Sequence, residues 1–383
     1  MRYDCGVKKN HFSKLIFILF LQLMGTTSLW AALGFEDAVF PELAVSGRAL
    51  ALGSAYISKV DDSAAAFYNP AGLGSVRKVK FHLSNIHAET NMGWLKLATG
   101  GKITEAITNL PVALTMEGIR QRLVANPGNL TNTRYQLVPN ITGRFFSIGY
   151  LFSRKTRMRL KSGASATLEY ADRYDYGPYG SMNLSLFGGI IKGGMTMILL
   201  TRHQVTEDSH DKATPLVIQD NAYSIGSGLF TIGGGKLTLP ISWLPCLSAT
   251  VHNAFNKNFT SFRGAGAPDK IKSSIDVGFS ITPKIGKRTR MHLEINYKDL
   301  TKKYTGVHFL RKALIGVELD FSRAFFLRFG YGDSYGTAGL GFKSKTIDFD
   351  LSTYSVNPDP TSGLIRGEED RRISLSISTG FGF

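Results

Sequence analysis

The 383-residue sequence has little cysteine and only one sizeable apolar run. Its two cysteines are Cys5 and Cys246, so the chain after residue 32 holds a single thiol and cannot form an internal disulfide. The apolar run, residues 15–24, is shorter than the roughly 20 residues that a membrane-spanning helix needs. A helical membrane protein of this length would need several longer runs, so the sequence excludes that class.

The run has the flanks of a secretory signal peptide. Three lysines precede it, and small residues follow it up to Ala31 and Ala32. We therefore predict a signal peptide at residues 1–32, cleaved near Ala31 or Ala32. No cysteine lies at the expected cleavage site, which argues against a lipid anchor. The chain is expected to be exported.

The last eleven residues alternate along their length. One face carries Ile373, Leu375, Ile377, Thr379, Phe381 and Phe383, and the other face carries only serine and glycine. An edge strand of a soluble sandwich would show charges on its wet face. The stretch resembles the closing strand of bacterial outer-membrane β-barrels, whose terminal phenylalanine belongs to the signal read by the barrel-assembly machinery. The resemblance implies that Phe381 and Phe383 form this signal.

Similar alternation recurs upstream, at residues 275–282, 291–298, 313–320, 325–332 and 347–353. The polar faces of these segments carry charges of both signs, which we expect to line a lumen and to pair with each other or with a plug. These side chains are Asp276, Glu294, Glu318, Asp320, Arg328, Asp348 and Asp350. Mixed signs favour a polar, plugged interior over a strongly ion-selective pore.

Long polar connectors alternate with short ones, as in outer-membrane barrels with short periplasmic turns and long outer loops. The predicted fold is therefore all-β, a transmembrane antiparallel barrel of about 14 strands, with an even number between 14 and 16. An even number requires either that residues 92–98 form a further short strand or that one of the counted segments is a loop. The basic clusters 154–161 and 284–290 are assigned to periplasmic connectors, and residues 101–110 to a helical turn or two.

Residues 33–75 do not alternate, and their small side chains suit a segment packed inside a lumen. Asp62 or Ser63 is expected to cap a short helix that Pro70 ends. Gly72 and Gly74 are expected to let the backbone turn tightly into the first strand.

The N-terminal segment carries the order Gly-Arg-Ala-Leu (47–50), Asp-Asp (61–62) and Asn-Pro-Ala-Gly-Leu (69–73). This order resembles the N-terminal hatch of the FadL/TodX outer-membrane transporter superfamily and its PorV/PorQ relatives. Residues 325–372 resemble the corresponding part of uncharacterised members of that group. The resemblance implies a signal peptide at 1–32, a hatch in the lumen at 33–75 and a barrel at 76–383. It further implies hatch or gating residues, namely Asn69, Pro70, Ala71, Gly72 and Leu73.

The formal charge of +16 does not point to nucleic acid here, because an exported chain does not meet it. The expected partners are outer-membrane lipid and lipopolysaccharide, the barrel-assembly machinery, and hydrophobic small molecules. We expect no cofactor, no metal and no enzymatic activity. His252-Asn253 is read as a lumen or rim pair, residues 208–211 as a solvated loop, and Gly233-Gly234-Gly235 as a flexible turn.

Three functions remain open at this level. The favoured one is a passive channel for hydrophobic small molecules in the bacterial outer membrane, gated by the hatch. The alternative is a PorV-like barrel that transports nothing and instead scaffolds protein secretion or surface attachment. An outer-membrane hydrolase is the third. The chain is shorter than FadL itself and has no obviously apolar outer loops, which weakens the case for fatty-acid uptake.

Overall fold

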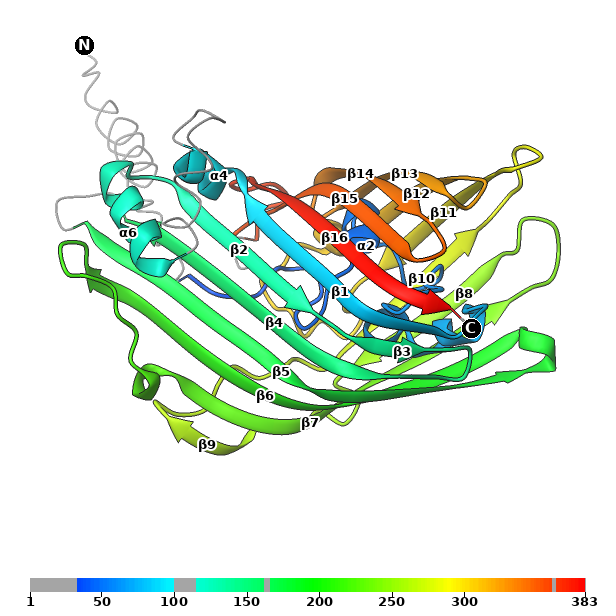
Figure 1. The fold of residues 1–383 in the computed structure, drawn as a ribbon, viewed down its shortest axis with the longest axis horizontal. Helices are drawn as coiled ribbons and strands as arrows, with labels where there is room; N and C mark the ends of the chain where they lie inside the picture. Colours follow the sequence, from blue (N-terminus) through cyan, green and yellow to red (C-terminus); the bar gives the residue numbers. More distant parts are fainter. Residues whose placement is uncertain (1–32, 100–114, 162–165, 360–362, 383) are drawn as a thin grey trace, which may run out of the picture. The chain divides into compact units, whose positions relative to one another are not determined.

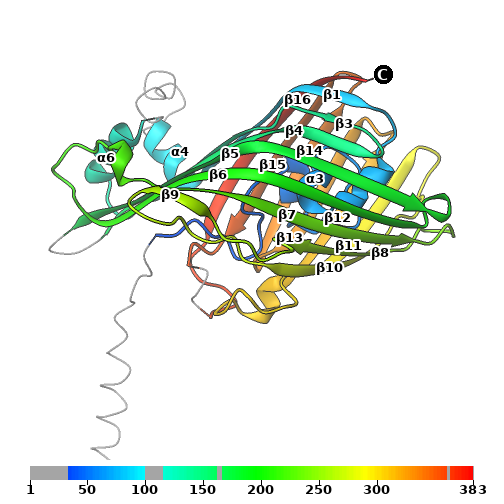
Figure 2. The same cartoon turned by 90° about the horizontal axis from the view of Figure 1, so that it is seen from below.

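The computed structural model describes residues 33–99, 115–161, 166–359 and 363–382. The expected signal peptide, the 101–110 segment and Phe383 lie outside the described residues. Strand segments pair with their neighbours in one antiparallel sheet, and β1 pairs with β16 over most of its length. The sheet therefore closes into a barrel (Figures 1 and 2).

The strand segments are β1 (Lys80–Asn91), β2 (Leu130–Leu137), β3 (Asn140–Thr142), β4 (Phe146–Leu160), β5 (Thr167–Leu186), β6 (Ile191–Asp211), β7 (Ser224–Thr238), β8 (Cys246–His252), β9 (Thr260–Gly264), β10 (Ser274–Ile281), β11 (Thr289–Tyr297), β12 (Ala313–Phe321), β13 (Phe325–Gly332), β14 (Tyr335–Lys343), β15 (Ile347–Val356) and β16 (Asp370–Gly382). The helices are α2 (Gly47–Ala51), α3 (Ala65–Tyr68), α4 (Met92–Thr99) and α6 (Met116–Ala125), with 3-10 turns η1 (Pro70–Ser75), η2 (Phe187–Gly189), η3 (Asp220–Ala222) and η4 (Phe309–Lys312). None of the described helices is both long enough and apolar enough to cross a membrane.

Two of the strand positions are interrupted. β2 and β3 both pair with β1 and β4, and the break between them holds Pro139, which has no N–H group for the ladder. β8 and β9 both pair with β7 on the side opposite β6. Counting each interrupted position once, the barrel has 14 strands, as predicted.

The two ends of the barrel differ. One end, called the turn end here, holds the start of β1 and the end of β16. Its connectors are residues 143–145, 187–190, 239–245, 282–288, 322–324 and 344–346. The other end, the loop end, holds most of the long connections, including α4, α6 and the segments 253–273, 298–312 and 357–369. The expected alternation of short and long connectors is confirmed.

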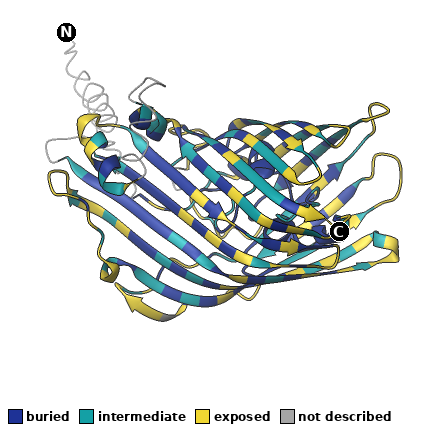
Figure 3. Cartoon of the chain, viewed as in Figure 1, coloured by how far each residue is buried: buried dark blue, intermediate teal, exposed yellow. Residues whose placement is uncertain are grey.

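Exposed and buried residues alternate along most strands (Figure 3). On β16, Leu375 and Phe381 are exposed on the outer face, while the serines of the inner face bond across the seam; Ser376 and Ser378 accept or donate hydrogen bonds with His87 and His82 at 2.7 Å. The outside of the barrel is thus an apolar surface, as lipid requires. The five upstream segments predicted from alternation correspond to β10, β11, β12, β13 and β15.

Strands β4 to β7 extend further than the others. β5 has 20 residues and β6 has 21, whereas a tilted strand spans a bilayer with about 9–11. Beyond the apolar band, outward residues of this wall such as Met158 and Leu168 are buried beneath α4, α6 and the 212–223 segment. Residues 92–98 therefore form neither a strand nor a plain loop: they belong to helix α4, which packs Trp94 and Leu97 into this cluster.

Residues 33–75, called the plug here, lie inside the barrel. Figure 1 shows α2, and Figure 2 shows α3, between the near and far walls of strands. Leu52 and Tyr56 of the plug belong to one buried apolar cluster with Ile198 and Phe230 of the barrel wall. The lumen is therefore less polar than expected, because one layer of it is an apolar core.

Candidate functional site

The Asn69–Leu73 turn is fully buried inside the barrel. Helix α3 ends at Tyr68, and Asn69 leaves helical geometry with φ −160° and ψ 104°. Asn69 Oδ1 accepts a hydrogen bond from the Ala71 N–H at 3.1 Å, and its Nδ2 donates to the Ile57 carbonyl at 2.9 Å. Pro70 occupies the first position of η1, where its missing N–H has no consequence. The turn is thus capped by Asn69 and pinned to the middle of the plug.

Glycines of the barrel wall make room for this turn. A Cβ atom on Gly194 of β6 would lie 2.4 Å from the Pro70 carbonyl carbon, and one on Gly234 of β7 would lie 2.1 Å from Asn69 Oδ1. The prediction that residues 233–235 form a flexible turn is wrong, because they lie inside β7. Glycine is found in strand interiors where another backbone approaches closely, as the Pro70 backbone does at Gly194.

The two plug glycines have a different role from the one predicted. Neither Gly72 nor Gly74 has a positive φ. A Cβ atom on Gly72 would lie 2.5 Å from the Val60 carbonyl oxygen, and one on Gly74 would lie 2.6 Å from the Ser185 Oγ. They are needed for close packing of the plug against itself and against β5.

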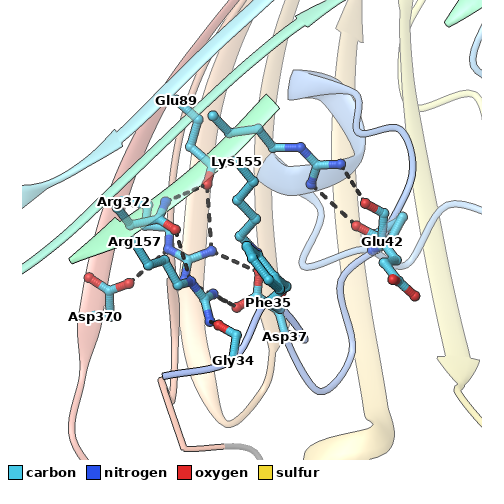
Figure 4. A network of polar contacts seen from close by, with 12 residues as sticks. Gly34, Phe35, Asp37, Glu42, Glu89, Lys155, Arg157, Asp370 and Arg372 are labelled. Carbon is cyan, nitrogen blue, oxygen red and sulfur yellow. Dashed lines mark hydrogen bonds and ion pairs between the residues drawn. The ribbon is translucent and has the colours of Figure 1, made fainter. Parts of the chain in front are cut away.

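The start of the plug is held by a cluster of cations around Asp37 (Figure 4). Its carboxylate pairs with Lys155 at 2.6 Å, with Arg372 at 2.9 Å and with Arg157. Lys155 also donates to the Phe35 carbonyl at 2.9 Å. Burial by itself would raise the pKa of Asp37, but the three positive charges outweigh it and hold the pKa well below its usual range.

A second acidic side chain of the plug, Glu42, is held in the same way. It accepts from Arg173 of β5 and Arg202 of β6, each at 2.8 Å. Arg134 of β2 donates to the backbone carbonyls of Glu42 and Leu43 at 2.8 and 2.9 Å. Burial would raise the pKa of Glu42, and the charges of Arg202 and Arg173 lower it overall. We call the Asp37 and Glu42 contacts together the plug clamp.

The clamp explains one wrong prediction. The basic cluster 154–161 was assigned to a connector at the turn end, but residues 154–160 lie in the half of β4 nearer the loop end, and Lys161 directly follows the strand. Lys155 and Arg157 face the lumen and are almost fully buried. A cluster of five basic residues is typical of a solvated turn when no acidic partner lies nearby in the sequence. The partner of Lys155 and Arg157 is Asp37, about 120 positions away.

Further toward the turn end, Arg48 of α2 connects the plug to the barrel wall. Its guanidinium makes two 2.7 Å bonds to Glu318 of β12, and a third of 2.7 Å to Asp61 of the plug. Glu318 also accepts from Arg328, which pairs in turn with Asp350. The expected pairing of lumen charges with each other and with the plug is confirmed. The Gly-Arg-Ala-Leu motif at residues 47–50 by itself predicts no role for Arg48.

Two cavities flank the plug. The larger, of about 480 Å³, lies toward the turn end and is lined by charged residues such as Lys59, Lys80 and Asp350. The smaller, of about 60 Å³, is mainly apolar and faces the loop end, with Ile271 and Tyr304 from the long loops in its lining.

The two cavities share three lining residues of the plug, Ala44, Phe67 and Tyr68. These three side chains form an apolar wall that both cavities touch.

The weaker candidates for chemistry have structural partners. His252 Nε2 bonds to Asp276 Oδ2 at 3.2 Å, and Asn253 bonds to backbone carbonyls of its own loop. Asp211 caps its own turn by accepting from Thr214 at 2.9 Å. Among the described residues there is no group of three or more His, Cys, Asp or Glu that could hold a metal ion.

Solved structures show which fold this is. The CymD monoaromatic hydrocarbon channel matches with a TM-score of 0.50 and 9% identity, over 91% of this chain and 99% of CymD. The chain has the fold of the FadL/TodX outer-membrane barrels. The Pseudomonas putida toluene transporter TodX matches over 90% of this chain and 100% of its own, at 11% identity and a TM-score of 0.47. A Pseudomonas aeruginosa FadL homologue matches over 90% of this chain and 100% of its own, at 12% identity and a TM-score of 0.32.

At these identities the likeness concerns the FadL/TodX fold alone, and the CymD match carries it. No protein-family model and no curated protein matches the sequence. A FadL/TodX-type barrel is an outer-membrane structure, which agrees with the apolar outer surface of this one. The function must be argued from the plug and its two cavities.

Proposed function

We propose that this protein is a passive outer-membrane channel for hydrophobic small molecules, gated by movement of its plug. The observation that supports the proposal is the pair of cavities that share Ala44, Phe67 and Tyr68 of the plug in their linings. A small apolar pocket at the loop end suits capture of an apolar molecule, and the larger cavity suits its release. The neighbours named for hydrocarbon transport, CymD and TodX, share the fold and support this class. Binding and release need no catalytic step.

The short connectors are assigned to the periplasm and the long loops to the outside, as in other bacterial barrels. The substrate then meets the apolar pocket first and the 480 Å³ cavity last. Passage requires that the wall between them open. Residues 67–73, which include Phe67, Tyr68 and the Asn69–Leu73 turn, are the segment proposed to move.

A reversible lock tests the proposal. Ser58 of the plug and Ser248 of β8 lie with their Oγ atoms 2.6 Å apart, close to the geometry of a disulfide. We expect the double variant Ser58→Cys/Ser248→Cys, in a Cys246→Ser background, to form a disulfide that ties the plug to the wall. Uptake of a hydrophobic fluorescent dye into proteoliposomes is expected to stop when the lock is oxidised and to return on reduction. Cys246 must be removed because its thiol lies near the Ser58 carbonyl.

The matched control is the single variant Ser58→Cys in the same background, which keeps the buried thiol but cannot form the bond. Its uptake should not depend on the redox state. Equal uptake by the oxidised and the reduced double variant, with the disulfide confirmed by mass, would show that the plug does not move at this point.

One observation favours the alternative, a barrel that scaffolds secretion or surface attachment without transport. The plug clamp fixes residues 37–42 through buried ion pairs from β4, β5, β6 and β16 and through hydrogen bonds from Arg134 of β2 to backbone carbonyls. Breaking such pairs costs several kcal/mol, about 3–5 for each lost partner. Under this alternative the channel stays shut, and the dye is excluded by the reduced and the oxidised lock alike.

A further inference from the structure

The connectors of the turn end carry positive charge and no negative charge. They comprise residues 76–79, which lead into β1, and the six connectors 143–145, 187–190, 239–245, 282–288, 322–324 and 344–346. Their charged residues are Arg77, Lys78, Arg144, Lys284, Lys287, Arg288, Arg323 and Lys345. None of these segments contains aspartate or glutamate. We call these side chains the basic rim.

The basic rim is not neutralised from within the protein. All of its members are exposed, and none makes an ion pair with any described residue. The nearest carboxylates, Asp320 and Asp348, line the lumen cavity, where Asp348 is already paired with Lys80 and Lys343. The loop end differs, since acidic residues such as Asp220, Asp269 and Glu369 lie among its cations.

Apolar side chains are exposed on the same connectors. They are Val79, Phe145, Phe187, Leu239, Ile241, Trp243, Leu244 and Ile285. Trp243 is 63% exposed and Phe187 is 73% exposed. These residues continue the apolar outer surface of the strands to the point where the basic rim begins. Lysine, arginine and tryptophan in such an arrangement are typical of the boundary between the hydrocarbon core and the headgroups.

We propose that the basic rim binds the headgroups of anionic phospholipids in the leaflet at the turn end. Its cations come from five of the seven segments and so extend around most of the barrel, leaving out only the adjacent connectors 187–190 and 239–245. A docking site for one acidic protein would gather on one side. Their position next to exposed apolar residues places them at phosphate depth. The proposal does not depend on transport, because it concerns the outside of the barrel.

Trp243 is a natural reporter of the lipid at this end. The full-length protein is reconstituted into vesicles of phosphatidylcholine and phosphatidylglycerol, with one or the other lipid brominated to quench tryptophan fluorescence. At low salt, we expect the anionic lipid to be preferred near Trp243 by about fivefold, the effect of roughly one nearby cation. The preference should largely disappear in 1 M salt, where the screening length is about 3 Å.

Two triple variants separate the basic rim from general charge. Lys284→Gln/Lys287→Gln/Arg288→Gln removes three cations from one turn-end connector and should abolish most of the preference. Lys257→Gln/Arg263→Gln/Lys270→Gln removes three exposed cations from a loop-end segment and should leave it intact. The lipid-dependent part of the quenching must vanish in Trp243→Phe.

Equal quenching by both lipids in the unmodified protein would overturn the proposal and favour an acidic soluble partner for the rim. The same loss of preference in both triple variants would also overturn it, because the effect would then follow net charge.

Discussion

Gly234 of β7 lies so close to Asn69 of the plug that a Cβ atom at this glycine would stand 2.1 Å from Asn69 Oδ1. No side chain can be accommodated there unless the Asn69–Pro70 turn moves. The neighbouring Gly233 and Gly235 have nothing within 4 Å of a Cβ atom. Of three consecutive glycines, only Gly234 would direct a Cβ atom into the plug.

This difference gives the first prediction. We expect Gly234→Ala to lower the free energy of unfolding by about 1–3 kcal/mol, as overpacked sites do, and to expose the plug to protease. Gly233→Ala is the matched control and should be neutral or slightly stabilising, because alanine reduces the freedom of the unfolded chain. Urea titrations of the two refolded variants would measure the difference. Equal midpoints would mean that the turn is not held against β7.

The second prediction concerns the plug clamp. Asp37→Asn leaves Lys155, Arg157 and Arg372 buried without their shared carboxylate, so we expect a loss of about 3–5 kcal/mol in the free energy of unfolding. Glu36→Gln is the control. Glu36 pairs with Lys272 at 2.8 Å near the surface, where an ion pair contributes about 0–1 kcal/mol. Similar losses in both variants would show that the burial of the clamp has no energetic effect.

The third prediction is the pH dependence of the clamp. The pKa of Asp37 is lower in the folded protein than in the unfolded chain, where it is about 3.9. The ionised Asp37 carboxylate therefore contributes its full share to the free energy of unfolding above about pH 4. This contribution is lost as the pH falls further, toward the pKa of Asp37 in the folded protein. Glu42 contributes in the same sense. Proteolysis of the plug by an acid protease should begin only below about pH 4. Release of the plug between pH 5 and pH 8 would contradict this assignment.

The fourth prediction concerns assembly. Phe381 and Leu375 both lie on the outer face of β16, with 59% and 37% exposure. If Phe381 and Phe383 form the assembly signal, Phe381→Ala or deletion of Phe383 should reduce the folded barrel in cells. Leu375→Ala should not. All three proteins should refold equally well in detergent, and a refolding defect in Phe381→Ala would indicate a packing role instead.

The sequence predicted the fold best where each strand has one wet and one lipid-facing side. The segments at 275–282, 325–332 and 347–353 became β10, β13 and β15 with small changes at their ends. In each, a side chain faces either the polar lumen or the apolar outside, so the period of two is visible in the residues themselves.

The predictions failed where both faces of a strand are covered by protein. The half of β4 near the loop end has the plug on one side and α4 and α6 on the other, so residues 155–158 are all buried and the alternation disappears. Lys155 and Arg157 there pair with Asp37, about 120 positions earlier in the chain. No local pattern shows that Arg157 meets Asp37, or that Gly234 gives way to Asn69.

The sequence by itself determined that this chain forms an antiparallel barrel of about 14 strands, because alternation, connector length and the absence of long apolar runs are local consequences of placing strands in lipid. Only the tertiary structure decided how the plug is held and where the cavities lie. Those features depend on contacts between residues more than 100 positions apart, such as Asp37 with Lys155, and such contacts exist only once the barrel has closed around the plug.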